Sequence, residues 1–443
     1  MSEPAAVEAA IVDAHRREWA LVLAATVRVA GDLDLAEECV QEAYAAALQS
    51  WTRDGVPASP AAWLTTAARR RAVDAIRREQ TLRSKLPLLL EPEEADKDTA
   101  VDRPLDEDLD AYDSVPDERL RLIFTCCHPA LAQEAQVALT LRLVCGVATA
   151  DVARAFLVSE PTMAARLTRA KKKISGARIP YRVPRPAELP DRLRPVLGVI
   201  HLLFTTGHTA PSGTDLIRAD LMERALHLAR MLRELMPDEP EVRGLLALLL
   251  VTDARRATRV DSAGRLLRLQ EQDRTRWDRR AMAEAHDLIV AGLRGGRAGR
   301  YVLQAAIASL YAEAPSYDAT DWAQLVALYD RLLEVWPSPV VALNRTVPLA
   351  MVAGPRAALA EVDRLEQQGS LAGYQYLHAV KADLLRRSGQ LAQAREAYAR
   401  ALALTANEAE RAFLSERLSE QSAASAHDAG ESATGRRHDS AQF

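Results

Sequence analysis

A helical spacing of apolar residues recurs along this chain and limits what it can fold into. Near residue 165 the side chains Met163, Leu167, Ala170 and Ile174 fall at i, i+4, i+7 and i+11, a spacing that places them on one face of an α-helix. Ala, Leu, Arg and Glu are abundant, whereas alternating runs of β-branched residues are few, so helix is favoured over strand. We therefore predict an all-α protein.

Length and cysteine content indicate the class of protein. A chain of 443 residues exceeds one ordinary hydrophobic core, so about two to four domains are expected. Its four cysteines are too few for a disulfide framework, and no signal segment opens the sequence. The longest apolar stretch, residues 244–251, is too short to cross a bilayer. These features predict a cytoplasmic protein that does not contact a membrane.

Charge is distributed unevenly and divides the chain. The segment 91–115 has 2 basic and 11 acidic residues and few apolar ones, which predicts a flexible acidic linker. The net charge is −1 before this segment, +6 over residues 116–182 and 0 beyond them. The expected parts are a helical module over 1–90, the linker over 91–115, a second module over 116–182, a helical extension over 183–425 and a disordered tail over 426–443.

The first module is predicted to contain three helices, at about 6–30, 34–50 and 60–82. Gly31 ends the first helix, Asp32 or Asp34 caps the second, and Pro60 suits the first turn of the third. The stretch "ARRRAVDAIRRE" in the third helix has apolar residues on one side and arginines on the other. Such a basic face is either solvated or bound to nucleic acid.

The second module has the spacing of a helix-turn-helix. A short helix begins at Thr149 or Ala150, "LVS" forms the turn, and Ser159 caps a second helix with Pro161 in an early position. Arginine can read guanine or bind phosphate, and lysine neutralises backbone charge, so the outer face suits the major groove. The alternative is a helical bundle with a solvated basic face. The outer-face residues are Thr162, Arg166, Arg169 and Lys173.

Together, "DLDLAEECVQEAYAAALQSW", "PAAWLTTAARRRAVDAIRRE" and "VSEPTMAARLTRAKKKI" resemble regions 2 and 4 of the extracytoplasmic-function (ECF) sigma factors of bacterial RNA polymerase. The segments "DERLRLIFTCCHPAL" and "ARIPYRVP", followed by a long helical extension, are similar to the subgroup with a tetratricopeptide-like (TPR-like) C-terminal domain. The resemblance runs from about residue 8 to residue 420. It implies a sigma factor that binds core polymerase and initiates transcription at promoters.

The resemblance also implies roles for residues of region 2. The second helix would bind the clamp helices of the polymerase β′ subunit, and the following loop and helix would recognise and melt the −10 promoter element. The implied core-binding residues are Asp34, Glu37, Glu38, Gln41 and Glu42. The implied −10 residues are Trp51, Trp63, Arg69, Arg70, Arg71, Arg77 and Arg78. Arg70 stands where the family usually has asparagine, which favours a phosphate contact there.

Region 4, by the same resemblance, would bind the −35 element with Thr162, Arg166, Arg169 and Lys173, and the polymerase β flap with another surface. In the extension, "GQLAQAREAYARALALTANEAE" matches the second helix of a TPR repeat, and weaker copies end at Pro237 and Pro337. A repeat surface could capture a protein partner, or the extension could dock on the sigma modules as a brake or brace. Pro348 predicts a kink in one repeat helix.

Other residues give little indication of chemistry. Cys126, Cys127 and His128 are adjacent and lack zinc-ligand spacing, and His201 and His208 lack a carboxylate or cysteine pattern. The glycines of "GLRGGRAGR" predict a turn between helices, because the ending of a phosphate loop is missing. We expect no metal, no cofactor and no enzymatic activity. The alternative function is a TPR scaffold whose DNA-binding module regulates transcription without joining polymerase.

Overall fold

The computed structural model describes residues 3–85 and 118–420, apart from residues 157, 211, 212, 215, 295 and 297. Within these residues all regular elements are helices and no β-strand forms. The prediction of an all-α protein is therefore confirmed. The chain divides into two compact units, residues 1–199 and residues 200–443. The expectations for the linker at 91–115 and the tail at 426–443 concern segments outside the described residues.

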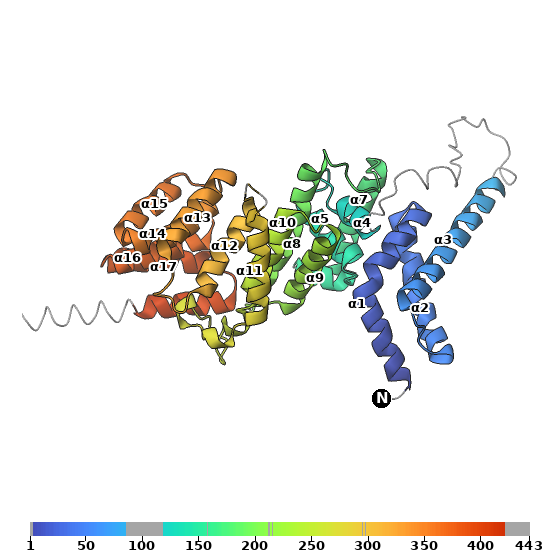
Figure 1. The fold of residues 1–443 in the computed structure, drawn as a ribbon, viewed down its shortest axis with the longest axis horizontal. Helices are drawn as coiled ribbons and strands as arrows, with labels where there is room; N and C mark the ends of the chain where they lie inside the picture. The colour runs from blue at the N-terminus through green and yellow to red at the C-terminus, as the bar shows by residue number, and fades with distance from the viewer. Residues whose placement is uncertain are drawn as a thin grey trace, which may run out of the picture. The chain divides into compact units, whose positions relative to one another are not determined.

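The first unit begins with a three-helix bundle, as predicted. Helices α1 (Glu3–Ala30), α2 (Leu33–Asp54) and α3 (Pro60–Lys85) each pack against the other two (Figure 1). Gly31 follows α1 with a φ of 67°, a left-handed conformation that glycine adopts without strain. Asp32 caps α2, because its Oδ1 accepts hydrogen bonds from the backbone N–H groups of Asp34 and Leu35 at 2.8 and 2.9 Å.

The helix-turn-helix module occupies the rest of the first unit. Its elements are α4 (Glu118–Cys126), α5 (Gln133–Leu139), the π-helical turn η2 (Thr140–Val144), α6 (Thr149–Ala155) and α7 (Glu160–Gly176). Ser159 caps α7 as predicted, since its Oγ accepts a hydrogen bond from the N–H of Thr162 at 3.4 Å. Helix α8 (Leu189–His208) then carries the chain from the first unit into the second.

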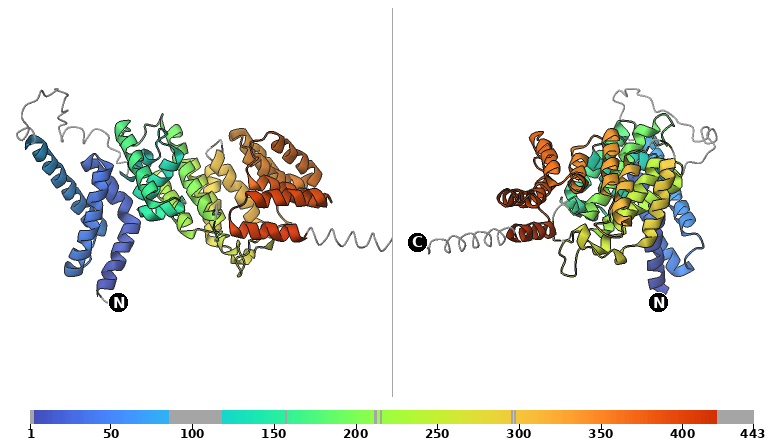
Figure 2. Two further views of the ribbon diagram at one scale, coloured as in Figure 1. Left: turned by 180° about the vertical axis from the view of Figure 1, so that it is seen from behind. Right: turned by 60° about the vertical axis from the view of Figure 1, so that its left-hand side comes forward.

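The second unit is a succession of helices in which neighbours along the chain pack against each other (Figure 2). They are α9 (Ala219–Leu235), α10 (Pro240–Asp253), α11 (Arg279–Arg294), α12 (Arg300–Glu313), α13 (Trp322–Val335), α14 (Pro339–Val352), α15 (Pro355–Gln367), α16 (Gln375–Arg387) and α17 (Leu391–Leu404). Three short 3-10 turns, η3 (Arg256–Thr258), η4 (Leu269–Glu271) and η5 (Arg274–Arg276), lie between α10 and α11. Residues 408–420 are also helical.

Small residues let helices of the second unit approach closely. A Cβ added to Gly244 in α10 would lie 2.4 Å from the backbone nitrogen of Val302 in α12, so only glycine fits at this crossing. In α17, Ala394 and Ala401 are completely buried and Tyr398 is 4% exposed. These residues form one core cluster with residues of α16.

Two further expectations for the second unit can be compared with its helices. The glycine-rich segment after Arg294 lies between α11 and α12, as the predicted turn requires. Pro348 lies inside α14, which continues on both sides of it from Pro339 to Val352. The helical nature of the extension is thus established, whereas its description as TPR-like stays a prediction.

Candidate nucleic-acid interface

Helix α7 has two chemically different faces. Met163, Leu167, Ala170 and Ile174 are buried against the module, as their spacing predicted. An adjacent face carries the four residues predicted to recognise DNA, and all four come from one element, so their relative positions are set by helical geometry. Of these, Thr162, Arg169 and Lys173 are exposed and Arg166 is partly exposed.

Most of the exposed groups on α7 already make weak local contacts. The Thr162 hydroxyl lies 2.8 Å from Ser159 Oγ, and Arg169 Nε donates to the carbonyl of Ala165 at 3.3 Å. Arg166 pairs with Glu134 on α5 at 3.1 Å, and that carboxylate is 73% exposed. Surface contacts of this kind contribute about 0–1 kcal/mol, so DNA phosphates or base edges could replace them at little cost.

The predicted core-binding residues on α2 differ in exposure. Asp34, Glu38, Gln41 and Glu42 are exposed, whereas Glu37 is only 7% exposed. Burial of a carboxylate is costly unless a cation compensates its charge. The compensating cations come from the helix-turn-helix module, and sequence reasoning had not identified either of them.

Lys171 of α7 and Arg142 of η2 hold Glu37. Lys171 Nζ lies 2.7 Å from both Glu37 Oε2 and Asp34 Oδ1, and Arg142 forms a second ion pair with Glu37. Burial by itself would lower the pKa of Lys171, but hydrogen bonds to the two carboxylates outweigh this, so its pKa is raised. We call these ion pairs, formed by Asp34, Glu37, Arg142 and Lys171, the clasp.

Apolar packing and backbone hydrogen bonds surround the clasp. Trp19 of α1 donates its indole N–H to the carbonyl of Leu143 at 2.9 Å, and the Tyr181 hydroxyl donates to the carbonyl of Ala24 at 3.0 Å. Gly146 has a φ of 65°, and a Cβ there would lie 2.8 Å from the His15 ring. The three-helix bundle and the helix-turn-helix module are therefore packed together in the described structure.

The arginines of α3 also divide into two groups. Arg69 donates from Nε to the carbonyl of Ala25 at 3.3 Å, and Arg71 lies 3.4 Å from the carboxylate of Glu42 on α2. Burial lowers the pKa of the Arg69 guanidinium. The other three predicted DNA-contacting arginines of this helix, Arg70, Arg77 and Arg78, are exposed.

The two predicted tryptophans lie together but differ in accessibility. Trp51 is 1% exposed and packs edge-on against Trp63, with 5.7 Å between the ring centroids. Trp51 thus belongs to the bundle core, and Trp63 carries the partly exposed ring. A base could reach Trp63 directly in this arrangement, whereas Trp51 would support that ring from the core.

The cysteines and histidines singled out from the sequence are individually buried or locally bonded. Cys127 lies 3.4 Å from the Thr140 hydroxyl, and burial raises the pKa of its thiol to about 12. Burial lowers the pKa of His201 to about 4. Over the described part of the chain, no three His, Cys, Asp or Glu side chains are grouped so that they could hold a metal ion. None of the described helices is long and apolar enough to cross a membrane.

Sequence comparison gives family matches for both modules and for part of the extension. Residues 11–81 match the family described as Sigma-70 region 2, and residues 121–174 match Sigma-70, region 4. Residues 192–292 match a family of unknown function (DUF6596). An uncharacterized protein of Rhizobium meliloti (strain 1021) is 40% identical over 416 residues, which cover 94% of this chain and 95% of that protein. No solved structure matches the chain.

Proposed function

We propose that this chain, which belongs to the ECF-like sigma factors, directs RNA polymerase to promoters. In these sigma factors Sigma-70 regions 2 and 4 are followed by a C-terminal extension. The chain would bind core polymerase with α2 and promoter DNA with α3 and α7. The observation that carries the proposal is the division of α7. Its apolar residues are buried in the module, while Thr162, Arg169 and Lys173 are exposed on an adjacent face.

In the proposed mechanism, α7 enters the major groove at the −35 element. Arg166 and Arg169 can each form paired hydrogen bonds with guanine, and Lys173 can neutralise a phosphate. The Arg166–Glu134 pair is on the surface, so its exchange for a DNA contact requires little energy. Specificity would therefore come from the arginines, and Lys173 would contribute to affinity for any sequence.

The −10 element would contact α3 and the partly exposed ring of Trp63. Arg70, Arg77 and Arg78 are exposed and can bind phosphates of the melted strand, while the ring of Trp63 offers a surface for an unstacked base. Trp51 packs against that ring at 5.7 Å and would keep it in position. Arg69 and Arg71 already contact α1 and α2, so we assign them a smaller share of DNA binding.

Core binding in this proposal requires the clasp to open. Glu37 is buried beneath Lys171 and Arg142, so the polymerase clamp helices cannot contact it while the helix-turn-helix module is packed there. The free chain would then exist in a closed form, and core polymerase would compete with the module for α2. Separation of the two modules would also let α3 and α7 reach different promoter elements.

The extension would modulate this activity, with its helical surface acting on the sigma modules or capturing a protein partner. A large residue in place of the fully buried Ala401 would overpack the contact between α16 and α17. We expect Ala401→Leu to alter the transcription rate without altering which promoters are used. The same proposal places the site of action in the cytoplasm, with polymerase and DNA.

Run-off transcription from a pool of randomised promoters, with core polymerase and the full chain, tests the proposal directly. Enrichment of a two-element promoter, together with comigration of the chain and core polymerase, is the expected result. A chain that shifts DNA but does not comigrate with core polymerase would instead be a DNA-binding regulator on a helical scaffold. A chain that does neither would contradict both functions.

A further inference from the structure

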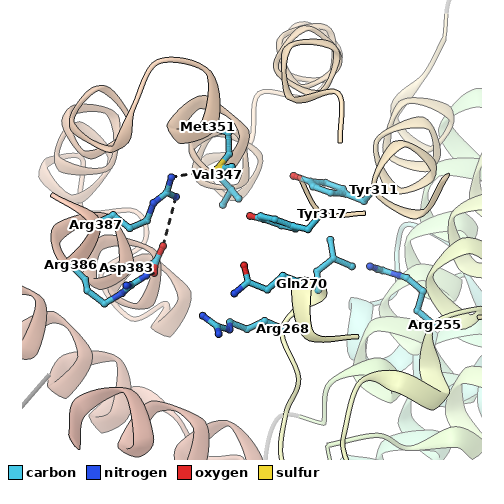
Figure 3. Close-up of a pocket in the computed structure, with 11 residues that line it drawn as sticks. Arg255, Arg268, Gln270, Tyr311, Tyr317, Val347, Met351, Asp383, Arg386 and Arg387 are labelled. Atoms are coloured by element: carbon cyan, nitrogen blue, oxygen red, sulfur yellow. Dashed lines mark hydrogen bonds and ion pairs between the residues drawn. The ribbon is translucent and has the colours of Figure 1, made fainter. Parts of the chain in front are cut away.

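The second unit contains a cavity of about 620 Å³ between α12, α14, α16 and the segment that follows α10 (Figure 3). This volume lies within the usual range of small-molecule sites, about 300–1,000 Å³. Four arginines and one aspartate line the cavity, together with aromatic and aliphatic side chains. The cavity is therefore positively charged, although the extension over residues 183–443 carries no net charge.

Three of the four arginines already have carboxylate partners. Arg268 donates to Glu271, with Nε 3.0 Å from Oε1. Arg386 lies 2.6 Å from Asp383, and Arg387 lies 3.9 Å from the same carboxylate. A single aspartate thus compensates two guanidinium groups on one wall, which leaves positive charge there for a ligand.

Arg255 is the exception, and it lies on the opposite side of the cavity. Its guanidinium extends toward Tyr311 and Tyr317 (Figure 3). Its Nε is completely buried and lacks a hydrogen-bond partner within the described structure. Its guanidinium carbon lies 5.8 Å from the centroid of the Trp277 ring. Burial, with the neighbouring charge of Arg274, lowers the pKa of Arg255 to about 10, so it remains a cation at neutral pH.

An uncompensated buried cation destabilises a fold unless an anion or hydrogen-bond acceptors offset it. Asp383, the one carboxylate among the lining residues, is engaged by Arg386 and Arg387 on the other wall, so an anionic ligand could compensate Arg255. A ligand that reaches both walls needs two separated negative charges. Planar guanidinium groups bind phosphate and carboxylate with paired hydrogen bonds.

The remaining walls favour a flat or apolar central part in the ligand. The rings of Tyr311 and Tyr317 both pack edge-on against Trp322, at 5.9 and 4.9 Å, which holds them in place. Val347 and Met351 add aliphatic surface, and Val347 is 36% exposed. Such surface gains stability when a ligand covers it, and Gln270 can supply a hydrogen bond.

We propose that this cavity binds a small organic anion with two negatively charged groups, phosphate or carboxylate, attached to an aromatic or apolar part. Arg255 binds one charged group, and Arg387 with Arg386 binds the other. The tyrosines and aliphatic residues contact the part between them. The inference depends only on the second unit, so it stands or fails independently of promoter binding.

Isothermal titration calorimetry of the full chain tests the site with two probes. Adenosine 3′,5′-bisphosphate carries two separate phosphates on the ribose of an aromatic nucleoside, and isophthalate carries two carboxylates on an aromatic ring. Saturable binding of either probe at one site per chain is expected, at least about tenfold tighter than binding of adenosine, which lacks the charge. The stronger probe identifies phosphate or carboxylate as the preferred group.

Arg255→Met removes the charge and preserves much of the side-chain length, and we expect it to weaken probe binding by at least about tenfold. Arg356→Met, at an exposed position of α15, is the matched control and should bind the probe like the unmodified chain. Arg387→Gln provides a second test if Arg255→Met lowers the folded fraction measured by circular dichroism. Absence of saturable binding by both probes would overturn the proposal, as would unchanged affinity in the folded variants. Binding of hexaglutamate in place of the small probes would overturn it in favour of a peptide site.

Discussion

The acidic face of α2 and the outer face of α7 are both proposed partner surfaces, but they differ in the closed first unit, because one residue of the α2 face is covered there. Thr162, Arg169 and Lys173 are exposed on α7, whereas Glu37 on α2 is 7% exposed beneath Lys171 and Arg142. Helix α7 takes part in both surfaces. Lys171 on its flank covers Glu37 of α2, whereas Thr162 lies on its outer face. One helix thus carries the face proposed to bind DNA and also covers part of the surface proposed to bind polymerase.

The largest expected effect is the opening of the clasp by Lys171→Glu. This change places a third carboxylate beside Asp34 and Glu37, and disruption of a buried ion pair costs about 3–5 kcal/mol. The closed form should lose stability, and core polymerase should bind at least about tenfold more tightly, because less energy is needed to expose α2. Fluorescence anisotropy of the labelled chain with core polymerase measures the difference.

The control for this change is Lys172→Glu, which introduces the same charge at an exposed neighbouring position of α7. It should leave core affinity close to that of the unmodified chain. Equal affinity of the two variants for core polymerase would contradict the idea that the clasp blocks α2.

A smaller effect on promoter recognition is expected from changes on the outer face of α7. Arg166→Ala or Arg169→Ala should cost about 1–3 kcal/mol in discrimination between promoter sequences if the arginine reads a base edge. Lys173→Ala should weaken binding to all sequences alike, because a phosphate contact carries no sequence information. Transcription from a panel of promoters with altered −35 elements measures the selectivity and the overall activity of each variant. If both arginine variants keep the selectivity of the unmodified chain, α7 does not recognise the −35 element.

The exposed arginines of α3 can be tested in the same way, because this face of α3 is also accessible to solvent while the clasp is closed. Replacement of Arg77 and Arg78 by alanine should slow promoter melting more than it weakens binding to core polymerase. It should also reduce the slope of log affinity for DNA against log salt concentration by about one unit per lost phosphate contact. Permanganate footprinting follows melting separately from binding. Unchanged thymine reactivity near the start site, with core binding intact, would contradict this assignment.

The smallest effect concerns pH. A lysine whose pKa is raised in the folded state contributes stability that is fully present below its unfolded pKa of about 10.4 and is lost as pH rises through the folded value. The affinity ratio between Lys171→Gln and the unmodified chain should therefore stay constant from about pH 6 to pH 9. A ratio that changes steeply within this interval would show that another group controls the clasp.

The helices and their faces could be predicted from the sequence, because they depend on local spacing. The 3.6-residue period placed Met163, Leu167, Ala170 and Ile174 on the buried side of α7, and Ser159 was recognised as its cap. The bundle of α1, α2 and α3 followed from Gly31, Asp32 and Pro60, residues whose preferred backbone conformations end or begin a helix. The residues of α7 proposed to face DNA follow from the same periodicity.

The contacts that decide accessibility could not be predicted in this way. Asp34 and Lys171 are separated by 137 positions, so their meeting depends on how two modules pack rather than on either helix. The only local signal was the place of Lys171 four residues after Leu167, close to the buried stripe. Likewise, Trp51 was predicted as a DNA contact, but packing of α2 against α3 buries it beneath Trp63.

The sequence by itself determined that the chain is all-α, that α7 is two-faced, and that regions resembling sigma regions 2 and 4 precede a helical extension. Periodicity, capping residues and motif order are local properties, so they survive without knowledge of the fold. Only the tertiary structure decided that Glu37 is covered by Lys171 and that Arg255 lacks a carboxylate beside a cavity of about 620 Å³. The physical reason is that burial and charge compensation arise from side chains distant in sequence, whose distances are set only when the helices pack.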